Sequence, residues 1–251
     1  MSITEKNNYW GFWATLLLGL LIFLLFSIIQ ALGIFAYIFS VDPQAVSVLS
    51  STNPGVGLSG LLNQYLFSGD AIAVAEIPAA FIGVLLICWF AWMRKPLTIE
   101  EYLDLNMPSI KSVLVFLGLL ILAIVLMETI NHVLDRPVPE FMTRVYSNTN
   151  NLPLFWVAVV IAAPFFEEFL FRGFLLEGFG RSKLGMPAAV IITSAIWAVI
   201  HMQYGWFEII SIFFIGILLC IAKIKTKSLY VPIAMHLLMN LTASIGMEFT
   251  Q

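Results

Sequence analysis

Charged residues are scarce in this chain of 251 amino acids. Asp, Glu, Lys and Arg make up only 11% of it, whereas a soluble domain averages about 25%. Hydrophobic residues make up 61%, and they gather in runs long enough to cross a bilayer as helices. The scarcity of charge therefore excludes an ordinary soluble domain and predicts an all-α protein that crosses the membrane several times.

Basic patches, a cysteine framework and internal repeats are missing as well. The chain has no Lys- and Arg-rich patch of the kind that binds nucleic acid, so we expect no nucleic-acid partner. Cys88 and Cys220 both lie in apolar runs and are expected to be small core residues rather than a disulfide pair. Without a visible inverted repeat, a transporter is a weaker interpretation.

The apolar runs predict a polytopic bundle of about seven transmembrane helices with short interfacial helices. At about 20 residues per crossing, the spans are expected at 10–39, 71–93, 112–134, 152–177, 186–202, 207–222 and 228–247. Interfacial helices are expected after Thr98, which begins a capping-box sequence, and near 139–145. Residues 40–70 contain no Lys or Arg and are expected to form a long outer loop.

The basic residues predict the orientation of the bundle. If seven spans alternate, only Arg136 and Arg144 fall on one side of the membrane. The other side receives Lys6, Arg94, Lys95, Lys111, Arg181, Lys183, Lys223, Lys225 and Lys227. Because Lys and Arg favour cytoplasmic loops, we expect a cytoplasmic N-terminus. The compact architecture without a targeting extension favours a multi-pass protein of a bacterial plasma membrane.

Two carboxylates and an arginine lie inside the fourth run, where charge is costly and usually functional. Glu168 and Arg172 are spaced i, i+4 with the acid first, which favours an ion pair on one helix face. Glu167 points about 100° away from Glu168 and has no partner on its own helix. Pro164, in the same run, is expected to kink it.

Two later runs supply polar partners. His201 lies near the end of the fifth run, and His236 and Asn240 share a face of the seventh. These groups support hydrolysis, with Glu167 as general base on a water that His201 orients and with His236 and Asn240 as oxyanion donors. Alternatively, Glu167, His201 and His236 hold a divalent metal such as zinc, which activates the water. The residues alone leave both versions open.

In order and spacing, three motifs resemble those of the CPBP intramembrane proteases, which include the type II CAAX prenyl endopeptidases and the bacteriocin-processing and immunity (Abi) proteins. The motifs are Glu167-Glu168-x-x-x-Arg172, Trp197-x-x-x-His201 and His236-x-x-x-Asn240. They lie between residues 152 and 247.

The resemblance implies an intramembrane endopeptidase that cleaves a peptide or membrane-protein substrate. It assigns water activation to Glu167 with His201, structural support to Glu168 and Arg172, and oxyanion stabilisation to the third motif. The family usually has Phe where this chain has Trp197, and we expect the packing to adjust with catalysis kept. Residues 113–251 are expected to form the protease core and residues 1–112 an accessory region with two spans and an interfacial helix. The position of the acidic motif favours a site that opens towards the cytoplasm.

Rival classes explain less of the sequence. The chain has no His-Glu-x-x-His of a zincin and no Gly-x-Gly-Asp of an aspartyl protease. Gly57-Leu58-Ser59-Gly60 matches a short rhomboid motif but leaves Glu167 unexplained. A non-catalytic scaffold or a bacteriocin-immunity protein of the same fold is the main alternative, and a transporter with charged residues along its pathway is weaker.

Overall fold

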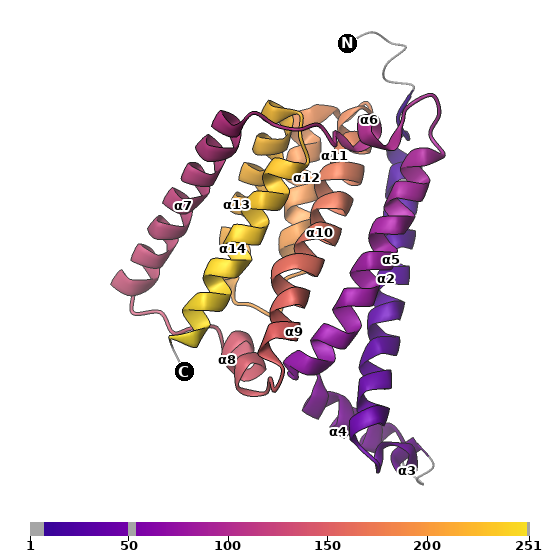
Figure 1. Ribbon diagram of the computed structural model, residues 1–251, viewed down its shortest axis with the longest axis vertical. Coiled ribbons are helices and arrows are strands. Elements are labelled where there is room, and N and C mark those ends of the chain that lie inside the picture. The colour runs from indigo at the N-terminus through magenta and orange to yellow at the C-terminus, as the bar shows by residue number, and fades with distance from the viewer. Residues whose placement is uncertain (1–7, 50–53, 250–251) are drawn as a thin grey trace.

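The computed structural model describes residues 8–49 and 54–249, and this part of the chain is helical, without a strand. Lys6, which contributes to the predicted charge asymmetry, lies outside the described residues. Six helical segments are long and apolar enough to cross a membrane: Phe12–Val41, Gly69–Trp92, Ile110–Val133, Leu152–Gly180, Trp206–Thr226 and Tyr230–Glu248. The predicted all-α membrane bundle is confirmed (Figure 1).

Five of the six segments are single helices, and short helices join some of them. The single helices are α2 (Phe12–Val41), α5 (Gly69–Trp92), α7 (Ile110–Val133), α13 (Trp206–Thr226) and α14 (Tyr230–Glu248). The short helices are α3 (Ala45–Leu49), α4 (Pro54–Tyr65), α6 (Ile99–Leu103) and α8 (Glu140–Ser147). The 40–70 connection, expected to be a loop, is therefore largely helical in its described part.

The fifth predicted span is shorter than expected. Helix α12 (Gly185–Val199) has 15 residues, which gives about 22 Å at 1.5 Å per residue, less than the roughly 30 Å of a bilayer core. Its neighbour α13 has 21 residues. The expected span 186–202 is wrong at its end, because residues 200–204 form turns instead of helix.

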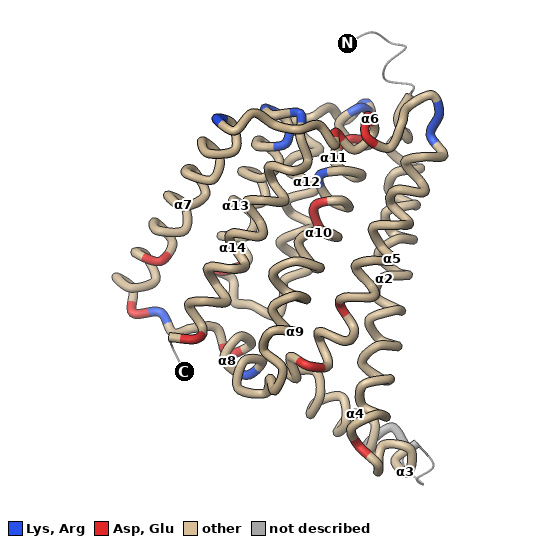
Figure 2. Tube along the Cα trace, viewed as in Figure 1, with Lys and Arg blue, Asp and Glu red and all other residues tan. Residues whose placement is uncertain are grey.

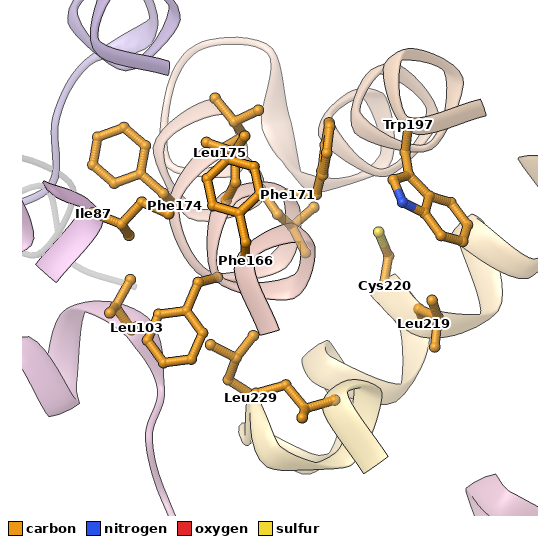
Figure 3. Packing of buried hydrophobic residues seen from close by; sticks show 14 of the residues in the cluster. Ile87, Leu103, Phe166, Phe171, Phe174, Leu175, Trp197, Leu219, Cys220 and Leu229 are labelled. Carbon is orange, nitrogen blue, oxygen red and sulfur yellow. The ribbon is translucent and has the colours of Figure 1, made fainter. Parts of the chain in front are cut away.

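The fourth segment, Leu152–Gly180, forms the centre of the bundle. It contacts α2, α5, α6, α12, α13 and α14, and Phe166, Phe171 and Phe174 are almost completely buried. Figure 3 shows these rings packed among Ile87 and other side chains from the surrounding helices. By contrast, only Leu120 of α7 is buried, so α7 lies on the flank of the bundle.

This central segment changes its helical type along its length. It consists of α9 (Leu152–Trp156), the π-helix η1 (Val157–Ala162), α10 (Ala163–Glu168), the π-helix η2 (Phe169–Leu175) and α11 (Leu176–Gly180). Pro164 is the second residue of α10, just after the first π segment. Because π-helical turns often mark functional sites, their position on both sides of the acidic pair is informative.

A largely buried cluster of ion pairs holds helices together at the end of the bundle where α6 lies. The Lys223 ammonium has no exposed side-chain surface and contacts the carboxylates of Glu177 and Asp104. Arg181 adds a second cation, 2.9 Å from Glu177. In Figure 2 most Lys and Arg residues gather at this end, and few lie at the other. The charge asymmetry expected from the sequence is thus a property of the folded bundle.

Helix α6 begins with the predicted capping box. The Thr98 hydroxyl accepts from the Glu101 N–H, and the Glu101 carboxylate accepts from the Thr98 N–H. Tyr102 and Leu103 are fully buried against the bundle. We expect Thr98→Ala to lower the free energy of unfolding by about 1 kcal/mol, measured as a lower melting temperature in detergent. Thr242→Ala is the control, because its exposed hydroxyl bonds only within α14, and an equal loss in both variants would contradict the capping role.

Candidate active site

Glu168 and Arg172 form the predicted ion pair on the central helix. The Arg172 Nη1 donates to Glu168 Oε1 over 2.8 Å, and neither side chain has any exposed surface. The guanidinium also lies 4.3 Å from the Trp197 ring centroid. Because this carboxylate is paired with a cation and completely buried, Glu168 is not accessible to a substrate.

Glu167, the adjacent residue, lies in a different environment. Its side chain is 16% exposed, and Trp197 Nε1 donates to its Oε2 over 2.5 Å. The Nε2 atom of His236 lies 4.0 Å from the same oxygen. The two neighbouring carboxylates are therefore separated as the sequence predicts: one is enclosed with a cation, and the other is accessible and faces neutral or titratable groups.

Both histidines contact the site through Nδ1. His236 Nδ1 lies 2.8 Å from Glu168 Oε1, so this imidazole lies between the two carboxylates. His201 Nδ1 lies 2.7 Å from the Trp197 carbonyl. A carbonyl only accepts, so His201 donates from Nδ1 and its Nε2 is left for another partner. Trp197 stands edge-on to both rings, at centroid distances of 5.4 Å and 5.3 Å.

Asn240 occupies the predicted face of α14 but already has a partner. Its Nδ2 donates to the Val159 carbonyl over 2.7 Å. Val159 lies in the first π segment, where the altered helix geometry leaves carbonyl groups available. An amide nitrogen carries two hydrogens, so one N–H of Asn240 remains for a ligand.

The role of Trp197 in holding Glu167 was not predicted from the sequence. The residue was expected to replace Phe as a packing aromatic, whereas its indole N–H donates to the exposed carboxylate. The signal was available, because a buried indole N–H needs an acceptor and Trp197 is only 1% exposed. Sequence reasoning also missed Gln30 of α2, which donates to the buried Glu76 of α5 over 2.5 Å.

We expect Trp197→Phe to lower kcat about tenfold with little change in melting temperature. The ring contacts are largely kept, but Glu167 loses a hydrogen bond to a charged group, an interaction worth about 1.5–3 kcal/mol. The effect is measured as peptide cleavage by purified protein, the activity that the sequence resemblance implies. Trp13→Phe serves as the control, since Trp13 is 71% exposed on α2, and equal kcat values for the two variants would contradict the assignment.

The residues proposed as metal ligands do not form a metal-binding cluster. Among the described residues, no three His, Cys, Asp or Glu side chains converge closely enough to hold one ion. His236 Nδ1 is directed at Glu168 and His201 Nδ1 at a carbonyl. These hydrogen bonds leave the Nε2 atom of each histidine for another partner, as in histidines that bind metal, so the metal alternative stays a prediction that a chelator tests.

Comparisons with known proteins place the same residues in a matched region. Residues 149–242 match the family model of Type II CAAX prenyl endopeptidase Rce1-like proteins. An uncharacterized 24.3 kDa protein of Escherichia coli is 30% identical over 108 residues, which cover 41% of this chain and 50% of that protein. The membrane-embedded CAAX protease MroQ of Staphylococcus aureus (strain USA300) is 33% identical over 92 residues, which cover 36% of this chain and 37% of that protein.

These matches cover half or less of the relatives' own length, and no solved structure matches the chain. The matched region nevertheless contains all three motifs, from Glu167 to Asn240. The chain is thus a membrane protein similar at family level to membrane proteases. The comparisons confirm the resemblance to the CPBP intramembrane proteases, and residues 149–242 carry it.

Proposed function

We propose that this protein is an intramembrane endopeptidase in which Glu167 activates the water that attacks a peptide bond. The observation that carries the proposal is the division of labour between adjacent carboxylates. Glu168 is enclosed with Arg172, while Glu167 is accessible and held in place by Trp197. A general base needs such an accessible, oriented carboxylate next to its substrate.

The spacing of Glu167 and His236 suits a single water molecule. A gap of 4.0 Å between Oε2 and Nε2 is the kind of polar separation that a bridging water fills. In the proposed reaction, Glu167 takes a proton from this water as the oxygen bonds to the carbonyl carbon. Glu167 then returns the proton to the amide nitrogen as the carbon–nitrogen bond breaks, which gives a carboxylic acid and an amine.

The negative charge that forms on the carbonyl oxygen needs donors. Asn240 offers its remaining N–H, and His236 donates from Nε2 when it carries both ring protons. His201 orients the water through its own Nε2, since its Nδ1 is engaged with the Trp197 carbonyl. Glu168 and Arg172 act on the reaction through His236, whose ring they position.

The test is cleavage by the purified protein in detergent, with and without a metal chelator. The probes are a farnesylated peptide with a C-terminal CAAX sequence and the same peptide without the lipid, because the matching family model is of CAAX prenyl endopeptidases and MroQ is described as a CAAX protease. We expect cleavage that persists with chelator and is lost in Glu167→Gln. Cleavage that stops with chelator and returns with zinc would favour the metal version, and cleavage that persists in Glu167→Gln would overturn the proposal.

We also propose an orientation of the protein in the membrane and the partners that it meets there. The Lys- and Arg-rich end that carries α6 is placed in the cytoplasm of a bacterial cell, by the preference of basic residues for that side. The partners are the lipid bilayer and a peptide or membrane-protein substrate. The chain would then cross the plasma membrane with its N-terminus inside.

A further inference from the structure

The turn between α12 and α13 lies beside the site, because it contains His201 and also Tyr204, whose ring is stacked on that of His201. Helix α12 is six residues shorter than α13, with which it packs, and residues 200–205 make up the difference. His201 and Tyr204 therefore lie on irregular backbone between the end of α12 and the start of α13. Such backbone is tolerated in a membrane only where protein buries it or where it lines a water-filled cavity.

A cavity of about 520 Å³ adjoins this turn. Its walls come from the 136–141 segment that follows α7, from Gln203 to Gly205, and from Glu208. The lining combines apolar side chains, such as Val138 and Phe141, with charged ones. Arg136 and Glu208 form an ion pair over 2.8 Å, with side chains 31% and 22% exposed. Partly exposed charges of this kind are stable when water reaches them. Helix α8, whose first residues Glu140 and Phe141 line the cavity, lies at the end of the bundle opposite α6 (Figure 1).

Tyr204 separates the cavity from the proposed catalytic groups. Its ring lies parallel to that of His201, with centroids 6.3 Å apart and 14° between planes. Phe141, which also lines the cavity, meets the Tyr204 ring edge-on at a centroid distance of 5.6 Å. Burial, followed by the negative charge of Glu167, raises the pKa of Tyr204 to about 12. The hydroxyl therefore stays neutral, and it lies within electrostatic reach of Glu167.

We propose that this cavity is a water-filled vestibule of the active site, through which water and the polar part of a peptide reach Glu167 past Tyr204. Tyr204 is then a positioning residue that holds the His201 ring. The vestibule opens at the end opposite the Lys- and Arg-rich cluster, which differs from the cytoplasmic opening expected from the sequence. The role in peptide access rests on the proposed protease function, whereas water access does not.

Water access can be tested without any substrate. In a Cys88→Ala/Cys220→Ala background, single cysteines are introduced by Gln203→Cys, Lys225→Cys and Leu122→Cys. The last is a lipid-facing control, because Leu122 is 65% exposed on α7. A membrane-impermeant maleimide is applied to right-side-out and inside-out vesicles from expressing cells. We expect Gln203→Cys to react from the side opposite to Lys225→Cys and Leu122→Cys to react from neither. Failure of Gln203→Cys to react, or reaction from the same side as Lys225→Cys, would overturn the vestibule.

The role of Tyr204 is tested by a matched pair of substitutions. Tyr204→Phe keeps the ring against His201, and Tyr204→Leu removes it. We expect Tyr204→Leu to lower kcat about tenfold or more, because small displacements of catalytic groups are costly, with KM changed less. We expect Tyr204→Phe to retain kcat within about threefold. Equal losses in kcat and in melting temperature for both variants would overturn the positioning role.

Peptide access through the vestibule is tested by the effect of maleimide labelling on kcat/KM. A bulky maleimide on Gln203→Cys is expected to lower kcat/KM by about tenfold or more, whereas the same label on Lys225→Cys leaves it unchanged. Full labelling with unchanged kcat/KM would overturn peptide access and leave water access in place. If the unlabelled protein cleaves peptides independently of Glu167, the proposed catalytic function fails, while the labelling pattern still decides whether the vestibule exists.

Discussion

Glu167→Gln is expected to lower kcat for peptide cleavage by about 10²–10⁴-fold, the range of general acid–base catalysis. The amide keeps the size of the side chain, and its carbonyl oxygen still accepts from the Trp197 indole, so the local packing is retained. What is lost is the ability to take a proton from water. We therefore expect a melting temperature in detergent within about 2 °C of the wild-type value, since substitutions that leave contacts intact change stability little.

The control for this variant is Glu100→Gln. The Glu100 side chain is exposed on α6, at the end of the bundle opposite the vestibule, so the same chemical change is made away from the site. Its kcat should stay within about twofold of wild type, as expected for an exposed position. Cleavage by Glu167→Gln within tenfold of wild type would contradict the role as base, and a large fall in melting temperature would mean that the variant reports on folding instead.

Local sequence patterns predicted the parts of this protein that depend on short-range geometry. The i, i+4 spacing of Glu168 and Arg172 predicted their ion pair, because one helical turn brings those side chains together whatever surrounds them. The capping box at Thr98 was predicted for the same reason. Six of the seven spans follow from hydrophobic length alone, which a bilayer imposes independently of tertiary contacts.

The remaining features depend on contacts between helices that are distant in sequence. No residue pattern marks the π turns around α10. Their geometry leaves the Val159 carbonyl available to accept a hydrogen bond from Asn240, so this contact could not be predicted either. The hydrogen bond from Trp197 to Glu167 joins two helices, so a single motif could only suggest that the indole needs an acceptor. Likewise, the sequence gives no sign that α12 ends at Val199, because Ile200, Met202 and Tyr204 in the following turn continue the apolar run.

Arg172→Met is expected to lower the free energy of unfolding by about 3–5 kcal/mol, the usual cost of removing one partner from a buried ion pair. Both side chains are completely buried, and Glu168 Oε2 has no hydrogen-bond partner among the residues that the structure describes. Without Arg172 the carboxylate keeps only the His236 contact in a site closed to water. The change is measured as a fall in melting temperature in detergent or as unfolding in mixed micelles.

Two further variants separate the charge effect from loss of packing. Arg144→Met breaks an exposed i, i+4 pair and a cation–π contact with Phe67, and it should cost about 1 kcal/mol, well below the loss in Arg172→Met. The double variant Glu168→Leu/Arg172→Met removes both buried charges, so it should recover much of the stability lost in Arg172→Met. It should not recover cleavage, because His236 has lost the carboxylate that positions its ring. Stability that stays as low in the double variant as in the single one would show that Arg172 acts through packing against Trp197 and not through its charge.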